Sequence, residues 1–88
     1  GSPIPFNLSC EGRLPFGSVT LNLCVKDGTI AQAKLYTDAL DSEISATVEN
    51  ALASLPFDFK AMSEALSGAL CEADATALTE LLSQEIFS

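Results

Sequence analysis

Apolar and polar residues alternate along residues 18–26, which is the clearest pattern in the chain. A period of two places successive side chains on opposite faces of a strand. The pattern therefore predicts a strand over Ser18–Lys26 with one buried face and one polar face. Its apolar positions are Val19, Leu21, Leu23 and Val25, and its polar positions are Thr20, Asn22, Cys24 and Lys26.

A second strand is predicted over Thr29–Thr37, directly after Asp27-Gly28. The Asp-Gly pair readily adopts the positive φ angles of a type I′ turn, whose twist matches that of the strands it joins. The two strands should therefore form a hairpin in which Lys26 pairs with Thr29.

The second strand of this hairpin does not keep the phase of the first. Strict pairing would turn Ala33 and Leu35 to the polar face. One extra residue around Ala31-Gln32 returns both to the apolar face and sets Ala33 opposite Leu23. Because a slip of one residue reverses every side chain of a strand, we predict a β-bulge at Ala31-Gln32.

A third strand, more polar than the other two, is predicted upstream of residue 14. The four residues Leu14-Pro15-Phe16-Gly17 form the predicted turn into the next strand, because proline suits a strand end rather than a strand centre. The apolar positions of this strand are Phe6, Leu8 and Cys10, and the polar positions are Asn7, Ser9, Glu11 and Arg13.

The apolar period changes to 3.6 beyond residue 41, which predicts helices. We expect N-caps at Asp41 or Ser42, at Asp58 and at Asp74, and we expect Pro56 to end the first helix. The three apolar stripes are Ile44, Val48, Ala51, Leu52 and Leu55; Phe59, Met62, Leu66, Ala69 and Leu70; and Leu78, Leu81, Leu82 and Ile86.

Strands over residues 6–38 followed by helices over residues 42–87 indicate an α+β fold. We expect a three-stranded antiparallel sheet with about three helices packed on one face. The length of 88 residues fits one domain over residues 3–88, with Gly1-Ser2 set aside as an expression scar. Since no apolar run approaches the ~18 residues of a membrane helix, we expect no membrane-spanning segment.

The charge balance excludes several functions. Twelve acidic residues face four basic ones, and the formal net charge is −8. Such a surface repels nucleic acids and anionic membranes. The chain has no histidine, so the commonest general base and the Ser-His and Cys-His nucleophile pairs are missing. We therefore expect no catalytic residue in this chain.

Three widely spaced cysteines, Cys10, Cys24 and Cys71, form no CxxC motif. We expect Cys10 on the apolar face of its strand, Cys24 on a polar face, and Cys71 at a helix terminus or in a loop. Structural zinc needs four converging ligands, so we expect no metal site. An odd, sparse set of cysteines suits a reducing compartment, and we expect the chain to be cytoplasmic.

Two features of carrier domains are open to simpler readings. Asp41-Ser42 opens a helix, as the modified serine of an acyl carrier does, but acyl carriers lack the strands that precede it here. Lys26 stands beside a hairpin turn, as the modified lysine of a lipoyl domain does, but it lies on the shoulder of the turn. We interpret the first as a helix cap and the second as a solvated strand end.

An ordered set of residues in the strand half resembles the C-terminal accessory domain of lipoate–protein ligases, in the lipoyltransferase family. Many relatives carry G-D-[FY]-[FY] where this chain has Thr37-Asp38-Ala39-Leu40, and the helical half matches more weakly. The matching residues are Phe6-Asn7, Ser9, Glu11, Arg13, Gly17, Val19, Leu21, Val25, Gly28, Ile30, Ala33, Tyr36-Thr37-Asp38 and Leu40, then Leu52, Phe57, Leu66 and Leu70.

The resemblance implies a role that composition does not show. Such ligases use ATP and magnesium to activate lipoate as lipoyl-AMP, and they then transfer the lipoyl group to a lysine of an acceptor protein. A large catalytic domain, on the same or a separate chain, binds these substrates. The resemblance implies that the small domain binds no cofactor, closes over the large domain for adenylation and swings away for transfer. Its fold is similar to that of sulfur-acceptor and iron–sulfur scaffold proteins.

The polar face of the first strand is the candidate contact surface for that catalytic domain. Polar rows on sheets serve at contacts between domains. We therefore expect Asn7, Ser9, Glu11, Arg13 and Asp38 to contact the catalytic domain, whereas the alternative is a face that is merely solvated. Two other functions stay open, namely an iron–sulfur scaffold or sulfur acceptor, and an interaction module with an unknown partner.

Overall fold

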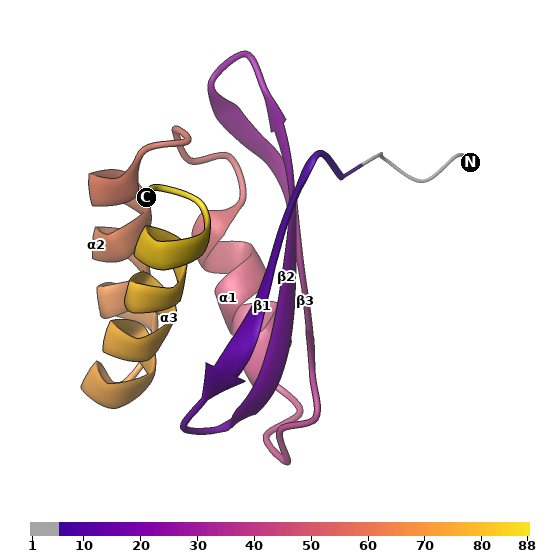
Figure 1. The fold of residues 1–88 in the computed structure, drawn as a ribbon, viewed down its shortest axis with the longest axis vertical. Coiled ribbons are helices and arrows are strands. Elements are labelled where there is room, and N and C mark those ends of the chain that lie inside the picture. The colour runs from indigo at the N-terminus through magenta and orange to yellow at the C-terminus, as the bar shows by residue number, and fades with distance from the viewer. Residues whose placement is uncertain (1–5) are drawn as a thin grey trace.

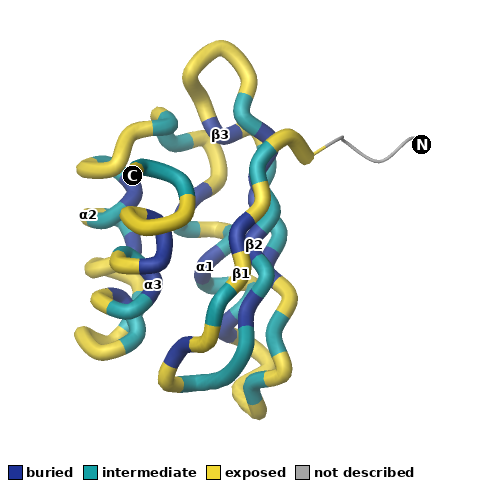
Figure 2. Tube along the Cα trace, in the orientation of Figure 1, coloured by how far each residue is buried: buried dark blue, intermediate teal, exposed yellow. Residues whose placement is uncertain are grey.

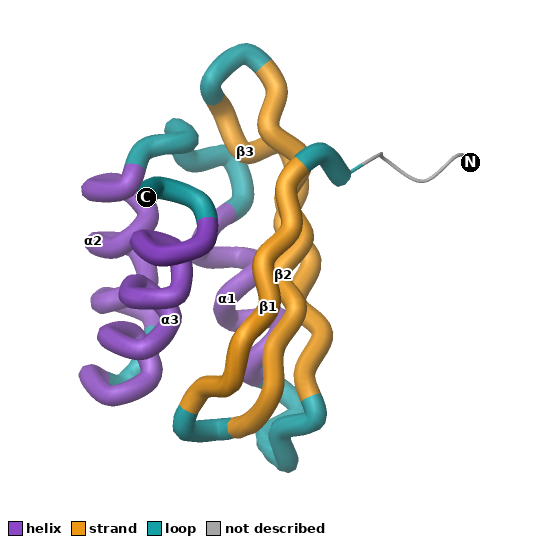
Figure 3. The backbone as a smooth tube through the Cα atoms, in the orientation of Figure 1, coloured by secondary structure: helices purple, strands orange, loops and turns teal. Residues whose placement is uncertain are grey.

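The structure, a computed structural model, describes residues 6–88, and the predicted expression scar at Gly1-Ser2 lies outside them. Its strands form one antiparallel sheet in the order β1-β2-β3, and the helices cover one face of it (Figures 1 and 3). The predicted α+β fold is therefore confirmed. The elements are β1 (Leu8–Leu14), β2 (Gly17–Lys26), β3 (Thr29–Thr37), α1 (Ile44–Leu52), α2 (Phe59–Ala69) and α3 (Glu72–Glu85).

The β2–β3 hairpin has the predicted turn and the predicted bulge. Lys26 pairs with Thr29, and the turn residues between them have φ angles of 54° and 75°. Cys24 pairs with Gln32, but the next residue of β2, Val25, pairs with Ile30. Ala31 is therefore the extra residue of β3. Beyond the bulge, Ala33 lies opposite Leu23, so the apolar side chains of both strands share one face.

Apolar side chains from the inner face of the sheet and from all three helices form a single core. Figure 2 marks buried positions on both the strands and the helices. Each fully buried large aliphatic side chain stabilises the fold by roughly 1.5–3 kcal/mol relative to exposure, so this set supplies most of the hydrophobic stabilisation. The most buried large side chains, all under 2% exposed, are Leu21, Leu23, Ile30, Val48, Leu52, Met62, Leu66, Leu78 and Leu82.

Three predictions about the strands are corrected. The first strand begins at Leu8 rather than at Phe6, which lies outside the strand and is exposed. The β1–β2 turn is shorter than expected, because Leu14 and Gly17 pair with each other and belong to the strands. Cys24 is buried, only 8% exposed, although alternation placed it on a polar face. Cys24 pairs with Gln32 of β3, and the side chain of Asn7 bonds to the backbone of Val25, the residue after Cys24. These neighbours shield the small thiol.

Helix α1 differs from the prediction at both ends. Its N-cap is Glu43 rather than Asp41 or Ser42, and the Asp41 side chain instead accepts a hydrogen bond of 2.9 Å from the Glu43 N–H. The helix ends at Leu52, four residues before Pro56. It ends there because the following segment reverses, with a positive φ at residue 54, and bonds to the outer edge of β3.

The other two helices confirm one predicted cap and correct another. Asp58 caps α2, since its side chain accepts a hydrogen bond of 2.9 Å from the Ala61 N–H. The N-cap of α3 is Cys71, and Asp74 lies within the first turn. Phe59 and Ala69 of the predicted apolar stripe are exposed, because they are the first and last residues of α2. No helix in residues 6–88 combines the length and apolarity that crossing a bilayer requires.

Candidate functional site

The sheet face that points away from the helices, called here the outer face, is polar. Register sets Glu11 of β1 beside Thr20 of β2, and Thr20 beside Tyr36 of β3. Tyr36 is 54% exposed, and the Lys34 ammonium lies 5.9 Å from the centre of its ring. The outer face comprises Ser9, Glu11, Arg13, Ser18, Thr20, Asn22, Lys34 and Tyr36.

Asn7, one of the predicted contact residues, has a structural role. Its Nδ2 donates a hydrogen bond of 2.8 Å to the Val25 carbonyl, and its Oδ1 accepts one of 2.9 Å from the Val25 N–H. The side chain thus replaces a backbone partner at the end of the β1–β2 pairing. Both polar atoms of the amide therefore already have a partner on β2.

Asp38 is exposed, and its side chain is bonded to the backbone of β2. Its Oδ1 accepts a hydrogen bond of 2.8 Å from the Ser18 N–H, which ties the β3–α1 loop to the start of β2. The same carboxylate lies against Gly17, whose φ is 140°. Leu40, two residues further along this loop, is fully exposed. Asp38 therefore positions the loop that presents Leu40.

Glu11 and Arg13 are the predicted contact residues whose charges stay available. Arg13 has one side-chain bond, of 3.3 Å, to the Ser18 hydroxyl. Across residues 6–88, the ion pair found within 4 Å joins Lys34 and Glu49 at 3.9 Å. Ser9 bonds to an outer-face neighbour on β2. An unpaired guanidinium on an acidic domain can make directed contacts with a partner's carboxylates.

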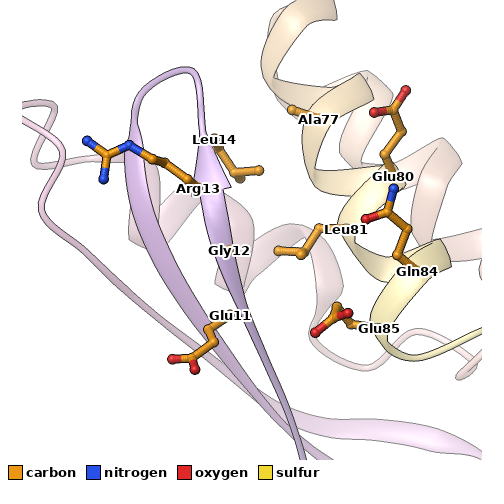
Figure 4. Close-up of a pocket in the computed structure, with 9 residues that line it drawn as sticks. All are labelled: Glu11, Gly12, Arg13, Leu14, Ala77, Glu80, Leu81, Gln84 and Glu85. Carbon is orange, nitrogen blue, oxygen red and sulfur yellow. The ribbon is translucent and has the colours of Figure 1, made fainter.

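Sequence reasoning missed a groove that runs between the edge of β1 and α3. Its volume is about 350 Å³. Figure 4 shows the Leu81 side chain pointing from α3 toward Gly12, whereas Glu11 and Arg13 point away from the helix. No local pattern signals this groove, because its two walls are far apart in the chain. The lining residues are Glu11, Gly12, Arg13, Leu14, Ala77, Glu80, Leu81, Gln84 and Glu85.

Two of the three cysteines are buried. Cys10 and Cys24 are buried, and Cys71 is exposed at the start of α3. Burial, with a smaller effect of the Glu85 carboxylate, raises the pKa of Cys10 from 9.0 to about 11. The described part of the chain holds no cluster of three or more histidine, cysteine or acidic side chains able to bind a metal ion. These positions do not favour the scaffold alternative.

Iodoacetamide at pH 8 is expected to modify Cys71 at least ten times faster than Cys10. The thiolate is the reactive form, and a pKa of about 11 leaves roughly one thousandth of Cys10 in that form at this pH. Mass spectrometry of timed samples measures both rates. Unfolding in urea should bring the two rates close together, and equal rates in the folded chain would contradict the burial of Cys10.

The chain matches the model of a known protein family. A family model described as bacterial lipoate protein ligase C-terminus matches residues 4–86, which includes all three strands and all three helices. A search of curated proteins finds no significant match. The matched range contains both the outer face and the groove beside β1.

Proposed function

The chain belongs to the family of bacterial lipoate protein ligase C-termini, and from this membership we propose that it is the accessory domain that supports activation of lipoate to lipoyl-AMP. The observation that carries the proposal is the match itself, which spans residues 4–86. The family makes a ligase catalytic domain the partner of this chain. In this proposal the catalytic domain binds lipoate, ATP and magnesium, and this chain binds none of them.

The proposed mechanism is closure rather than chemistry. Adenylation requires cationic groups that neutralise the triphosphate in the transition state, and a domain with a net charge of −8 is poorly suited to supply them. Its contribution is instead to dock on the catalytic domain and exclude water from the reacting groups. Release of the domain then opens the site to the lysine of the lipoyl acceptor.

The outer face suits a contact that forms and breaks in each cycle. Contacts between domains that move are more polar than permanent ones. The outer face offers the free charges of Glu11 and Arg13 and the exposed ring of Tyr36. Tyrosine and arginine are the residue types that most often anchor interfaces. We assign the docking contact to this face, with Arg13 as the residue expected to anchor it.

Reconstitution from two separate pieces tests the proposal. The chain alone should show no lipoate-dependent exchange of pyrophosphate into ATP. Added to the catalytic domain of its ligase, it should restore this exchange. Transfer from preformed lipoyl-AMP should depend on it less, because that step needs the open form. Exchange by the isolated chain, or no effect of adding it, would overturn the proposal.

Arg13→Glu is expected to lower lipoyl-AMP formation in the reconstituted ligase about tenfold, equivalent to about 1.4 kcal/mol of lost contact. Folding should be spared, because Arg13 is exposed and its described side-chain bond is a single one of 3.3 Å. Exposed substitutions usually change stability by under about 0.5 kcal/mol. Adenylation rate against the unmodified chain is the measurement, with thermal melts as control. Unchanged adenylation would mean that the outer face is only solvated.

A further inference from the structure

The two edges of the sheet differ in how far their backbone groups are hydrogen-bonded to the rest of the chain. Along the outer edge of β3, the Ile30 N–H donates to the Leu55 carbonyl and the Ile30 carbonyl accepts from the Ser54 N–H, each at 2.8 Å. Farther along that edge, the Leu35 N–H donates to the Glu49 carboxylate at 2.8 Å. Among residues 6–88, nothing comparable pairs with the outer edge of β1. That edge is therefore open.

The hydrogen-bond alternation of the sheet shows which backbone groups are unpaired. Leu14 and Gly17 are the pair that closes the two-residue β1–β2 turn, and Asn7 bonds to the backbone of Val25 on the same side of β2. The backbone N–H and C=O groups of the odd-numbered residues of β2 thus point toward β1. In an antiparallel ladder, successive residues of a strand bond to alternate sides. The backbone N–H and C=O groups of the intervening β1 residues, Ser9, Glu11 and Arg13, therefore point outward.

This open edge lacks a proline and a bulge, two of the usual obstacles to pairing, although Glu11 and Arg13 lie on it. Edge strands are commonly blocked by a proline, a bulge or a covering segment. Residues 8–14 contain no proline, and their register with β2 runs without a shift. Helix α3 lies beside the edge without bonding to it, and Leu81 packs so closely on Gly12 that a Cβ there would come within 2.7 Å of it. The groove of about 350 Å³ thus has a closed floor and an unpaired backbone along one wall.

The negative charge of the groove favours a positively charged segment as its ligand. Its α3 wall carries Glu80 and Glu85, whereas the Glu11 side chain of β1 points away from the helix (Figure 4). The one cation in its lining, Arg13, points toward the outer face rather than into the groove (Figure 4). A second copy of this acidic chain would be repelled, whereas a segment that carries lysine or arginine would be attracted.

We propose that an extended, lysine- or arginine-bearing segment of the ligase catalytic domain pairs with the outer edge of β1 as a fourth strand. Its backbone would bond to the free groups of Ser9, Glu11 and Arg13, and its basic side chains would face Glu80 and Glu85. Addition of a strand to an open edge is a recurring mode of peptide recognition. The identity of the partner rests on the proposed function, and the edge is continuous with the outer face through Arg13.

Binding of the separately produced catalytic domain, measured by titration calorimetry, tests this inference. Glu80→Lys should weaken binding at least tenfold, whereas Glu64→Lys, an equal charge change at an exposed site on α2, should weaken it less than threefold. Glu11→Pro removes one outward N–H without removing a bond to β2, and it should also weaken binding at least tenfold. Amide exchange of Ser9, Glu11 and Arg13 should slow when the catalytic domain binds.

The outcomes separate this inference from the proposed function. Equal effects of Glu80→Lys and Glu64→Lys on binding, with no slowing of amide exchange in β1, would overturn the proposed fourth strand. If Arg13→Glu still weakened binding in that case, the proposed accessory role would stand. Slow exchange of the same amides in the free chain would show that they are already protected without the catalytic domain. That result would also overturn the proposed fourth strand. No association of the two pieces would overturn both. If Glu11→Pro fails to fold, the Glu80→Lys comparison and the amide exchange decide.

Discussion

Leu23→Ala is expected to lower the free energy of unfolding by about 2–5 kcal/mol, the range for leucine side chains removed from a packed core. Leu23 is 0% exposed and lies at the centre of β2, between Leu8 of β1 and Ala33 of β3. Truncation leaves a cavity that the sheet and the helices above it fill only in part. Since small domains have a total stability of about 5–15 kcal/mol, this one change removes a large share of it.

Urea unfolding followed by circular dichroism measures the effect. Leu40→Ala is the matched control, because the same atoms are removed from a fully exposed side chain. We expect it to change the free energy of unfolding by under about 0.5 kcal/mol. A loss below about 1 kcal/mol for Leu23→Ala would show that this face of β2 does not carry the core.

Gly17→Ala is expected to destabilise the domain by about 1–3 kcal/mol through backbone strain alone, because Gly17 has a φ of 140°, a region open almost only to glycine. A Cβ at this position would also press on the Asp38 carboxylate, which accepts the hydrogen bond from Ser18. The substitution should therefore loosen the β3–α1 loop as well. Denaturant melts report the stability, and amide exchange of Ser18 reports the loss of its bond.

Gly68→Ala is the control for that substitution and should have the opposite sign. Gly68 lies in α2, and a Cβ there meets nothing within 4 Å. Alanine is favoured over glycine in a helix by about 0.5–1 kcal/mol, so this variant should be more stable than the unmodified chain. If both glycine substitutions destabilised the domain equally, strain at Gly17 would not be the cause.

The sheet was predictable in detail because its signals are local. Alternation assigns each side chain to a face, and Asp27-Gly28 specifies the turn that sets the register. The bulge at Ala31 followed from the same rule, since without it Leu35 would have faced away from the core. The family also follows from ordered positions along the chain.

The candidate site was predictable only in part. Alternation correctly turned Ser9, Glu11 and Arg13 to the outer face. It could not show that Asn7 and Asp38 are engaged, because each bonds to the backbone of β2 at a distance of 18 or 20 positions along the chain. A polar side chain in a sequence does not reveal whether its partner is water, backbone or another protein.

What the sequence alone determined is the order of elements, the inner and outer faces of the sheet and the acidic surface, because periodicity and composition are properties of neighbouring residues. Only the tertiary structure decided where α1 ends and which sheet edge is free. The segment after α1 leaves the helix because it satisfies the exposed backbone of β3, and no later segment does the same for β1. The end of α1 and the identity of the free edge both depend on which unpaired backbone groups come within hydrogen-bonding distance once the chain has folded.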